Sequence, residues 1–155
     1  MKRTLLLLLA AAVALMLSLS ASAASSPGAK LLIHHQLRGC HSWSLDGNRF
    51  QVSQSVSLKR GGFLTVTNSD VMSHQLIKLS GSSVAMSLVN AGASATGKLK
   101  PPYAAGLMPH MGSVLRVSFA KAGLYTFTTK EGADYFPNVK TVGPDNVLKL
   151  RVVVA

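Results

Sequence analysis

The sequence predicts one small all-β domain, a β-sandwich of roughly six to eight short strands. Three observations support this prediction. Short runs of residues alternate between apolar and polar side chains, which is the pattern of a half-buried strand. Clusters of Gly, Asn, Asp and Pro separate these runs, as turns do. No segment of the domain keeps the helical period of about 3.6 residues, so a sandwich is favoured over an alternating α/β fold.

The first residues have the order of a secretory signal peptide. Lys2 and Arg3 are basic, residues 5–17 form an apolar run, and Ala21 and Ala23 supply the small residues that signal peptidase requires. A retained membrane anchor is the competing interpretation, but the run is short for a bilayer span. We expect cleavage after Ala23, a periplasmic or secreted protein, and no membrane span after cleavage. The chain then consists of a signal peptide (1–23), a linker (24–30) and one domain (31–155).

Several segments of the domain have strand character, and turn signals connect them. They are residues 31–45, interrupted at Gly39, and residues 50–58, 63–67, 75–79, 114–119, 124–129 and 146–154. Glycines in 59–62 and 120–123 predict a hairpin at each of these places. Residues 80–109 show no sustained period, so an irregular stretch is expected there, with room for a helical turn at 84–89.

The composition is strongly basic. Sixteen Lys and Arg residues against five Asp and Glu give a formal net charge of +11, which falls by two if Lys2 and Arg3 leave with the signal peptide. The lysines are spread singly rather than gathered in a stripe with aromatic residues, so nucleic-acid binding is not expected. The charge favours an anionic partner, such as an acidic redox protein or the envelope surface.

Sequence motifs of catalysis are missing. The chain has no Gly-x-Ser-x-Gly, no phosphate-binding loop and no His-Glu-x-x-His, and it offers few carboxylates for acid–base chemistry. We therefore expect that the protein is not an enzyme.

Strand directions bring the single cysteine toward several histidines. If the turns at 59–62 and 120–123 lie at one end of the sandwich, His74 and His110 lie at the other end, and the first strand carries Cys40 and His41 there. Imidazole and thiolate together suit copper or zinc. The soft sulfur of methionines beside the two loop histidines favours Cu(I); these are Met72, Met108 and Met111.

Each of these residues also has an ordinary explanation. A methionine often fills a gap in the core, and a histidine is often a surface or hydrogen-bonded residue. Neighbouring Cys40 and His41 point to opposite faces of a regular strand, so only one of them is a ligand unless a bulge forms at Gly39. His34 and His35 lie further from the predicted site and are expected to be structural or exposed.

Two segments resemble the cupredoxins, the β-sandwich copper proteins related to plastocyanin. Residues 65–74, Thr-Val-Thr-Asn-Ser-Asp-Val-Met-Ser-His, resemble the loop that leads to the family's first histidine ligand, and residues 121–127 resemble the Gly-x-Tyr-x-Phe strand before its copper loop. The resemblance implies a Greek-key sandwich and copper chemistry. Of the usual ligands it carries over only His74, because Thr129 stands at the cysteine position and 130–142 contain no Cys, His or Met. A normal blue-copper site at the usual residues is thereby excluded.

The sequence therefore predicts an exported, copper-binding cupredoxin-like protein that acts in electron transfer or copper handling. Its predicted metal ligands are His74, His110, Cys40 and His41, with zinc as the other metal that such ligands accept. The alternative is a metal-free interaction module of the envelope, with the same fold and a basic surface.

Overall fold

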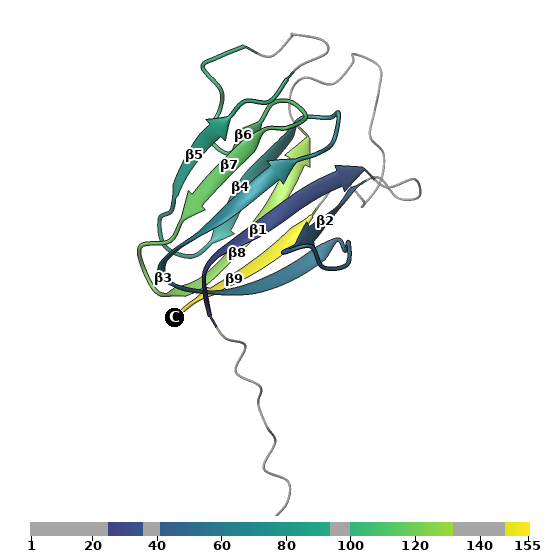
Figure 1. Ribbon diagram of the computed structural model, residues 1–155. Coiled ribbons are helices and arrows are strands. Elements are labelled where there is room, and N and C mark those ends of the chain that lie inside the picture. Colours follow the sequence, from purple (N-terminus) through teal and green to yellow (C-terminus); the bar gives the residue numbers. More distant parts are fainter. Residues whose placement is uncertain (1–24, 36–40, 94–99, 132–147) are drawn as a thin grey trace, which may run out of the picture.

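The computed structural model describes residues 25–35, 41–93, 100–131 and 148–155, and the described chain is all strand and loop (Figure 1). The all-β prediction is confirmed. Nothing in the described residues forms a helix with the length and apolarity that crossing a bilayer requires. The strands are β1 (Ser26–His35), β2 (His41–Leu45), β3 (Ser53–Asn68), β4 (His74–Ser80), β5 (Ala85–Asn90), β6 (Leu107–Met108), β7 (Val114–Ser118), β8 (Gly123–Glu131) and β9 (Lys149–Val154).

Strand β3 belongs to both layers of the sandwich. Its first half, up to Leu58, pairs with β9, whereas its second half, from Phe63, pairs with β1 and β7. One layer therefore has the order β3-β9-β8-β4-β6 and the other the order β2-β1-β3-β7-β5 (Figure 1). The chain bends between the layers at Gly61, whose φ of 78° is a conformation that favours glycine.

The hairpin predicted at 59–62 is therefore wrong. The hairpin predicted at 120–123 is wrong as well, because β7 pairs with β3 and β5 whereas β8 pairs with β4 and β9. At 59–62 the reason is the same. The chain does turn there, but the two halves of β3 lie in opposite layers instead of pairing with each other. Alternation of apolar residues is the same in either arrangement, which is why the sequence pattern does not distinguish them.

Apolar side chains from both layers fill the space between them. Phe119 packs edge to face against Tyr125 and Phe127, with ring centroids 5.0 Å and 6.0 Å apart. The Tyr125 hydroxyl donates to the Lys121 carbonyl at 2.7 Å, so this buried tyrosine keeps a hydrogen bond. Trp43 is fully buried, as expected for a core residue rather than a stacking platform.

The single strand predicted for 31–45 is also wrong, because this segment forms the antiparallel pair β1 and β2. Leu31 lies opposite Leu45, and Ile33 lies opposite Trp43. Residues 36–40, which include the break expected at Gly39, lie outside the described part. Strand β1 also begins at Ser26, inside the segment expected to be a linker.

The irregular stretch predicted for 80–109 contains strand β5 instead, and the expected helical turn at 84–89 is wrong. Val84 and Met86 pack against the core while Ala85 and Ser87 face solvent, which is the alternation of an edge strand. Because only two of these side chains contact the core, the apolar signal in the sequence is weak.

Candidate functional site

His74 and His110 lie at the same end of the sandwich, as the strand directions predict. His74 begins β4 and is the register partner of Met108 in β6. Asn68 ends β3 at this level, and its backbone N–H donates to the Ser113 carbonyl at 2.9 Å. The loop 69–73 and the segment 108–113 are thus neighbours.

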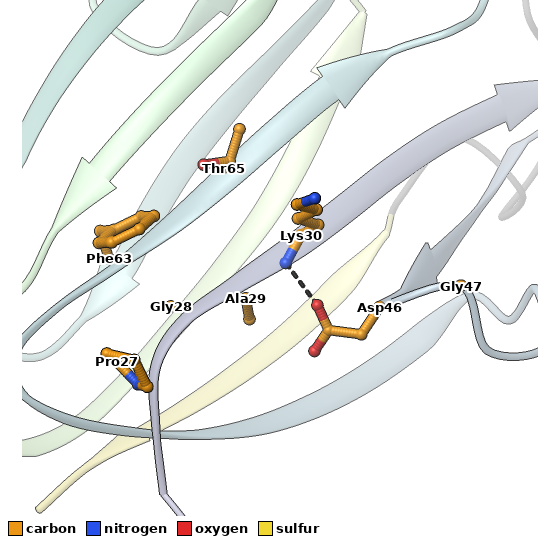
Figure 2. A pocket seen from close by; sticks show the side chains of 8 residues that line it. All are labelled: Pro27, Gly28, Ala29, Lys30, Asp46, Gly47, Phe63 and Thr65. Carbon is orange, nitrogen blue, oxygen red and sulfur yellow. Dashed lines mark hydrogen bonds between the residues drawn. The ribbon is translucent and has the colours of Figure 1, made fainter.

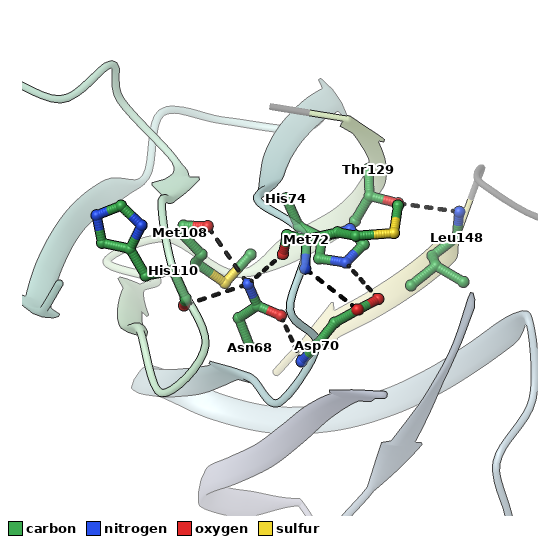
Figure 3. A network of polar contacts seen from close by, with 8 residues as sticks. All are labelled: Asn68, Asp70, Met72, His74, Met108, His110, Thr129 and Leu148. Atoms are coloured by element: carbon green, nitrogen blue, oxygen red, sulfur yellow. Dashed lines mark hydrogen bonds and ion pairs between the residues drawn. The ribbon is translucent and has the colours of Figure 1, made fainter. Parts of the chain in front are cut away.

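Asn68 ties these two segments together through its side chain (Figure 3). Its Nδ2 donates to the carbonyl of Met72 at 2.7 Å and to that of His110 at 3.3 Å. Its Oδ1 accepts from the backbone N–H of Asp70 at 2.9 Å. Since Asn68 is fully buried, water does not replace these partners if they are lost. The amide therefore fixes the loop that carries His74 relative to the segment that carries His110.

Asp70 orients the His74 ring. The Nε2 atom of His74 lies 3.2 Å from Oδ2 of Asp70, and the two side chains are 2% and 0% exposed. The other carboxylate oxygen of Asp70 accepts from the Met72 N–H at 3.2 Å. A carboxylate on one ring nitrogen is the usual outer partner of a metal-binding histidine, because it fixes the tautomer and makes the other nitrogen more basic. Coordination of a metal by this ring would therefore use Nδ1.

Thr129, which stands where the resemblance predicts a cysteine, has a structural contact. It is 2% exposed, and its Oγ1 accepts from the backbone N–H of Leu148 at 3.1 Å. The hydroxyl thereby joins β8 to the start of β9. Its cross-strand partner is Leu76, two residues after His74 on β4.

His110 is held through its backbone. Its N–H donates to the Ser113 hydroxyl at 2.9 Å, and that hydroxyl donates to the Ala91 carbonyl at 2.7 Å. The ring is 7% exposed and meets Tyr103 edge to face, with centroids 6.3 Å apart. In Figure 3 it lies beyond Met108 from His74 and points away from the Asn68 network.

The described residues place the other predicted ligands only in part. Cys40 lies outside them, and of His41 the backbone alone is described. His41 begins β2 and lies opposite His35 of β1. Two residues earlier on β1, the carbonyl of Ile33 accepts from the N–H of Ser69 at 2.9 Å. The backbone of residue 41 is therefore at the same end as the loop before His74.

The expected cause of this position, a first strand that runs on to an Asp46–Gly47 turn at the same end as His74, is wrong. The Asp46–Gly47 turn lies at the opposite end of β2, where the N–H of Lys30 donates to Asp46 Oδ1 at 2.7 Å. Among the side chains that the structure describes, no three His, Cys, Asp or Glu form a group that could hold a metal. The four-ligand set of His74, His110, Cys40 and His41 stays a prediction.

Sequence reasoning missed Asn68 and Asp70, which appeared only as turn-forming residues. Their short polar side chains do form such turns, since Asn68 and Asp70 each accept from the backbone two residues ahead. The sequence signal that could have indicated this contact was the spacing of Asp70 and His74: a carboxylate stands four residues before a histidine, in a loop that leads into an apolar strand. His34 is exposed, as expected, and its ring lies tilted beside that of Phe50, with centroids 5.8 Å apart.

A hollow of about 510 Å³ lies away from these histidines, at the start of β1 (Figure 2). Phe63 and Thr65 of β3 form one wall, and Lys30 and the turn at Asp46 form another. Phe63 is wedged between Gly28 and the Arg116 guanidinium, which lies 3.7 Å from the ring centroid. The cation thus covers one face of the ring, and the tip of the ring lies against Gly28.

Comparison with known proteins gives no family assignment. No protein-family model and no curated protein matches the sequence. Among solved structures, the chain is similar to a purple cupredoxin from Nitrosopumilus maritimus, with 15% identity and a TM-score of 0.41 over 81% of this chain and 98% of that one. It is also similar to a multicopper oxidase from Pediococcus acidilactici, with 12% identity and a TM-score of 0.38 over 84% of this chain and 26% of the oxidase. Similarity this low leaves the family open.

Proposed function

We propose that this protein is an exported, cupredoxin-like copper-binding protein in which His74 is the central ligand. One observation carries the proposal: a buried imidazole is oriented by a buried carboxylate through Nε2. This is the arrangement that prepares the other ring nitrogen for a metal. Asp70 also adds negative charge beside the site, which favours a bound cation.

The neighbouring donors fit copper. Met108 is the cross-strand partner of His74 and is fully buried, so its thioether lies within side-chain reach of the ring. Met72 comes from the loop that Asn68 and Asp70 fix, and Cys40 precedes the residue that begins β2 at this end. Imidazole with thioether or thiolate is a donor set of copper, and thioether sulfur favours Cu(I). Copper would supply one-electron chemistry at this end of the sandwich.

Two roles follow from two versions of this donor set. With Cys40 as a thiolate ligand, the protein would carry electrons and show a visible charge-transfer band. With His74 and the methionines alone, it would handle Cu(I) and remain nearly colourless. In either role the basic charge favours an anionic partner, and no catalysis by the protein itself is required.

Replacing His74 with alanine is expected to weaken Cu(I) binding by more than about 100-fold, because the central ligand is removed. A competition titration with a chromophoric Cu(I) chelator measures this affinity, and elemental analysis of protein purified from the periplasm measures copper content. The matched control is His34→Ala, which removes an exposed imidazole from the same chain. Its Cu(I) affinity is expected to equal that of the wild type.

Equal affinity in His74→Ala and the wild type would contradict the proposal. If the purified wild-type protein neither contains nor binds copper, the metal-free interaction module is favoured instead. If the purified protein binds Zn²⁺ more tightly than copper, the site would be assigned to zinc.

A further inference from the structure

We infer that the outer surface of the β3-β9-β8 layer docks onto an anionic lipid bilayer. This surface, here called the β9 face, consists of the outward side chains of three adjacent strands. They are Ser53, Ser55, Ser57 and Lys59 of β3, Lys149, Arg151 and Val153 of β9, and Leu124, Thr126 and Thr128 of β8. The inference does not depend on the copper site.

The strand register arranges these side chains in rows across the sheet. Lys149 lies between Ser53 and Thr128, and in the next row Arg151 lies between Ser55 and Thr126. The intervening residues of β9 are buried in the core, so both cations point outward. Because they are two residues apart on one strand, their backbone positions are about 7 Å apart.

Every polar group of these rows can donate a hydrogen bond to an anion. The two central side chains are cationic and exposed, and hydroxyls flank each of them. Ser80 of β4 extends the hydroxyl surface, since its Oγ lies 2.7 Å from Oγ1 of Thr126. The described residues of this face include no Asp or Glu, whereas on the other layer the exposed Lys30 lies beside Asp46. The β9 face is therefore complementary to closely spaced phosphates.

The partly apolar character of the β9 face favours a bilayer over an acidic protein. The third row contains Val153 and Leu124, and Leu124 is 47% exposed. Apolar residues beside cations are the combination with which peripheral proteins enter the headgroup region. The hollow at Phe63 and Lys30, which has room for an anchoring side chain of a protein partner, lies on the other layer.

The test is sedimentation of the purified protein with vesicles of phosphatidylcholine alone or of an equal mixture with phosphatidylglycerol. The double substitution Lys149→Gln/Arg151→Gln is compared with Lys30→Gln/Arg116→Gln, which removes the same charge from the other layer. Each cation near an anionic membrane contributes about 1 kcal/mol, so the first variant should bind the mixed vesicles about 30-fold more weakly. The second variant should bind them like the wild type, and added salt should release the protein.

Three results would overturn the inference: no preference of the wild type for mixed vesicles, an equal loss in the two double variants, or Lys149- and Arg151-dependent binding to soluble polyglutamate without vesicle binding. The last result would assign the face to an acidic polymer or protein. Thermal unfolding of each variant shows that a loss does not come from misfolding. Copper binding should be unchanged in both variants, so failure of this inference is distinguishable from failure of the copper proposal.

Discussion

Replacing Asp70 with alanine is expected to lower the free energy of unfolding by about 4 kcal/mol, from two buried hydrogen-bonding groups that lose their acceptor and from the space left by the side chain. The carboxylate is fully buried and is the hydrogen-bond partner of His74 Nε2 and of the Met72 N–H. Its removal leaves both groups buried without the acceptor they use, and it opens space in the loop before β4. Urea denaturation followed by tryptophan fluorescence measures the change, because the chain has one tryptophan, Trp43, in the core.

The control for this substitution is Asp46→Ala. Asp46 also accepts a backbone N–H, from Lys30, but it is exposed, so water replaces the lost bond and a much smaller change is expected. If Asp70→Ala and Asp46→Ala lower the free energy of unfolding by similar amounts, Asp70 contributes no more to stability than an exposed turn residue does. The variant Asp70→Asn keeps the shape of the side chain and separates folding from function. It should fold, yet bind Cu(I) about 10- to 100-fold more weakly, because the amide NH2 would donate to Nε2 of His74 and move the ring proton to Nδ1, the nitrogen that would coordinate copper.

Replacing Asn68 with alanine is expected to cost about 3 kcal/mol, the second largest effect. The side chain satisfies the carbonyls of Met72 and His110 and the N–H of Asp70 from a fully buried position. Each buried group left unpaired costs on the order of 1 kcal/mol or more. The same denaturation experiment measures the loss.

Asn68→Asp provides a sharper version of this prediction. The substitution places carboxylate oxygens against the carbonyls that Nδ2 now contacts, and adds charge beside Asp70, so it should destabilise at least as much as alanine. The control is Asn90→Ala on the edge strand β5, where the exposed Oδ1 accepts from the Gly92 N–H. A stable Asn68→Asp protein would show that the amide does not hold the two segments together.

The all-β class and most strands followed from residue alternation, because alternation directly reports which side chains face a core. Strand β4 (His74–Ser80), for example, extends the predicted segment 75–79 by one residue at each end. The errors concerned strand pairing, because alternation does not specify which strand lies beside which. The two halves of β3 have the pattern of a hairpin but pair with β9 on one side and with β1 and β7 on the other.

The candidate site was predictable in location but not in its contacts. Strand direction alone placed His74 and His110 at one end, since both flank strands that reach it. The sequence did not reveal that Asp70 faces His74, because the direction of a loop side chain depends on packing that a periodic pattern does not encode. It also did not reveal that the His110 ring turns away from this pair (Figure 3).

The most direct test of the copper proposal is a proton–nitrogen NMR correlation spectrum of the histidine rings during titration with Cu(I). The Nδ1 resonance of His74 should shift as copper binds, while Nε2 keeps the proton that it shares with Asp70. His34 should be unaffected. Unchanged His74 resonances at saturating Cu(I), or copper on Nε2 in place of the Asp70 contact, would contradict a site built around this oriented imidazole.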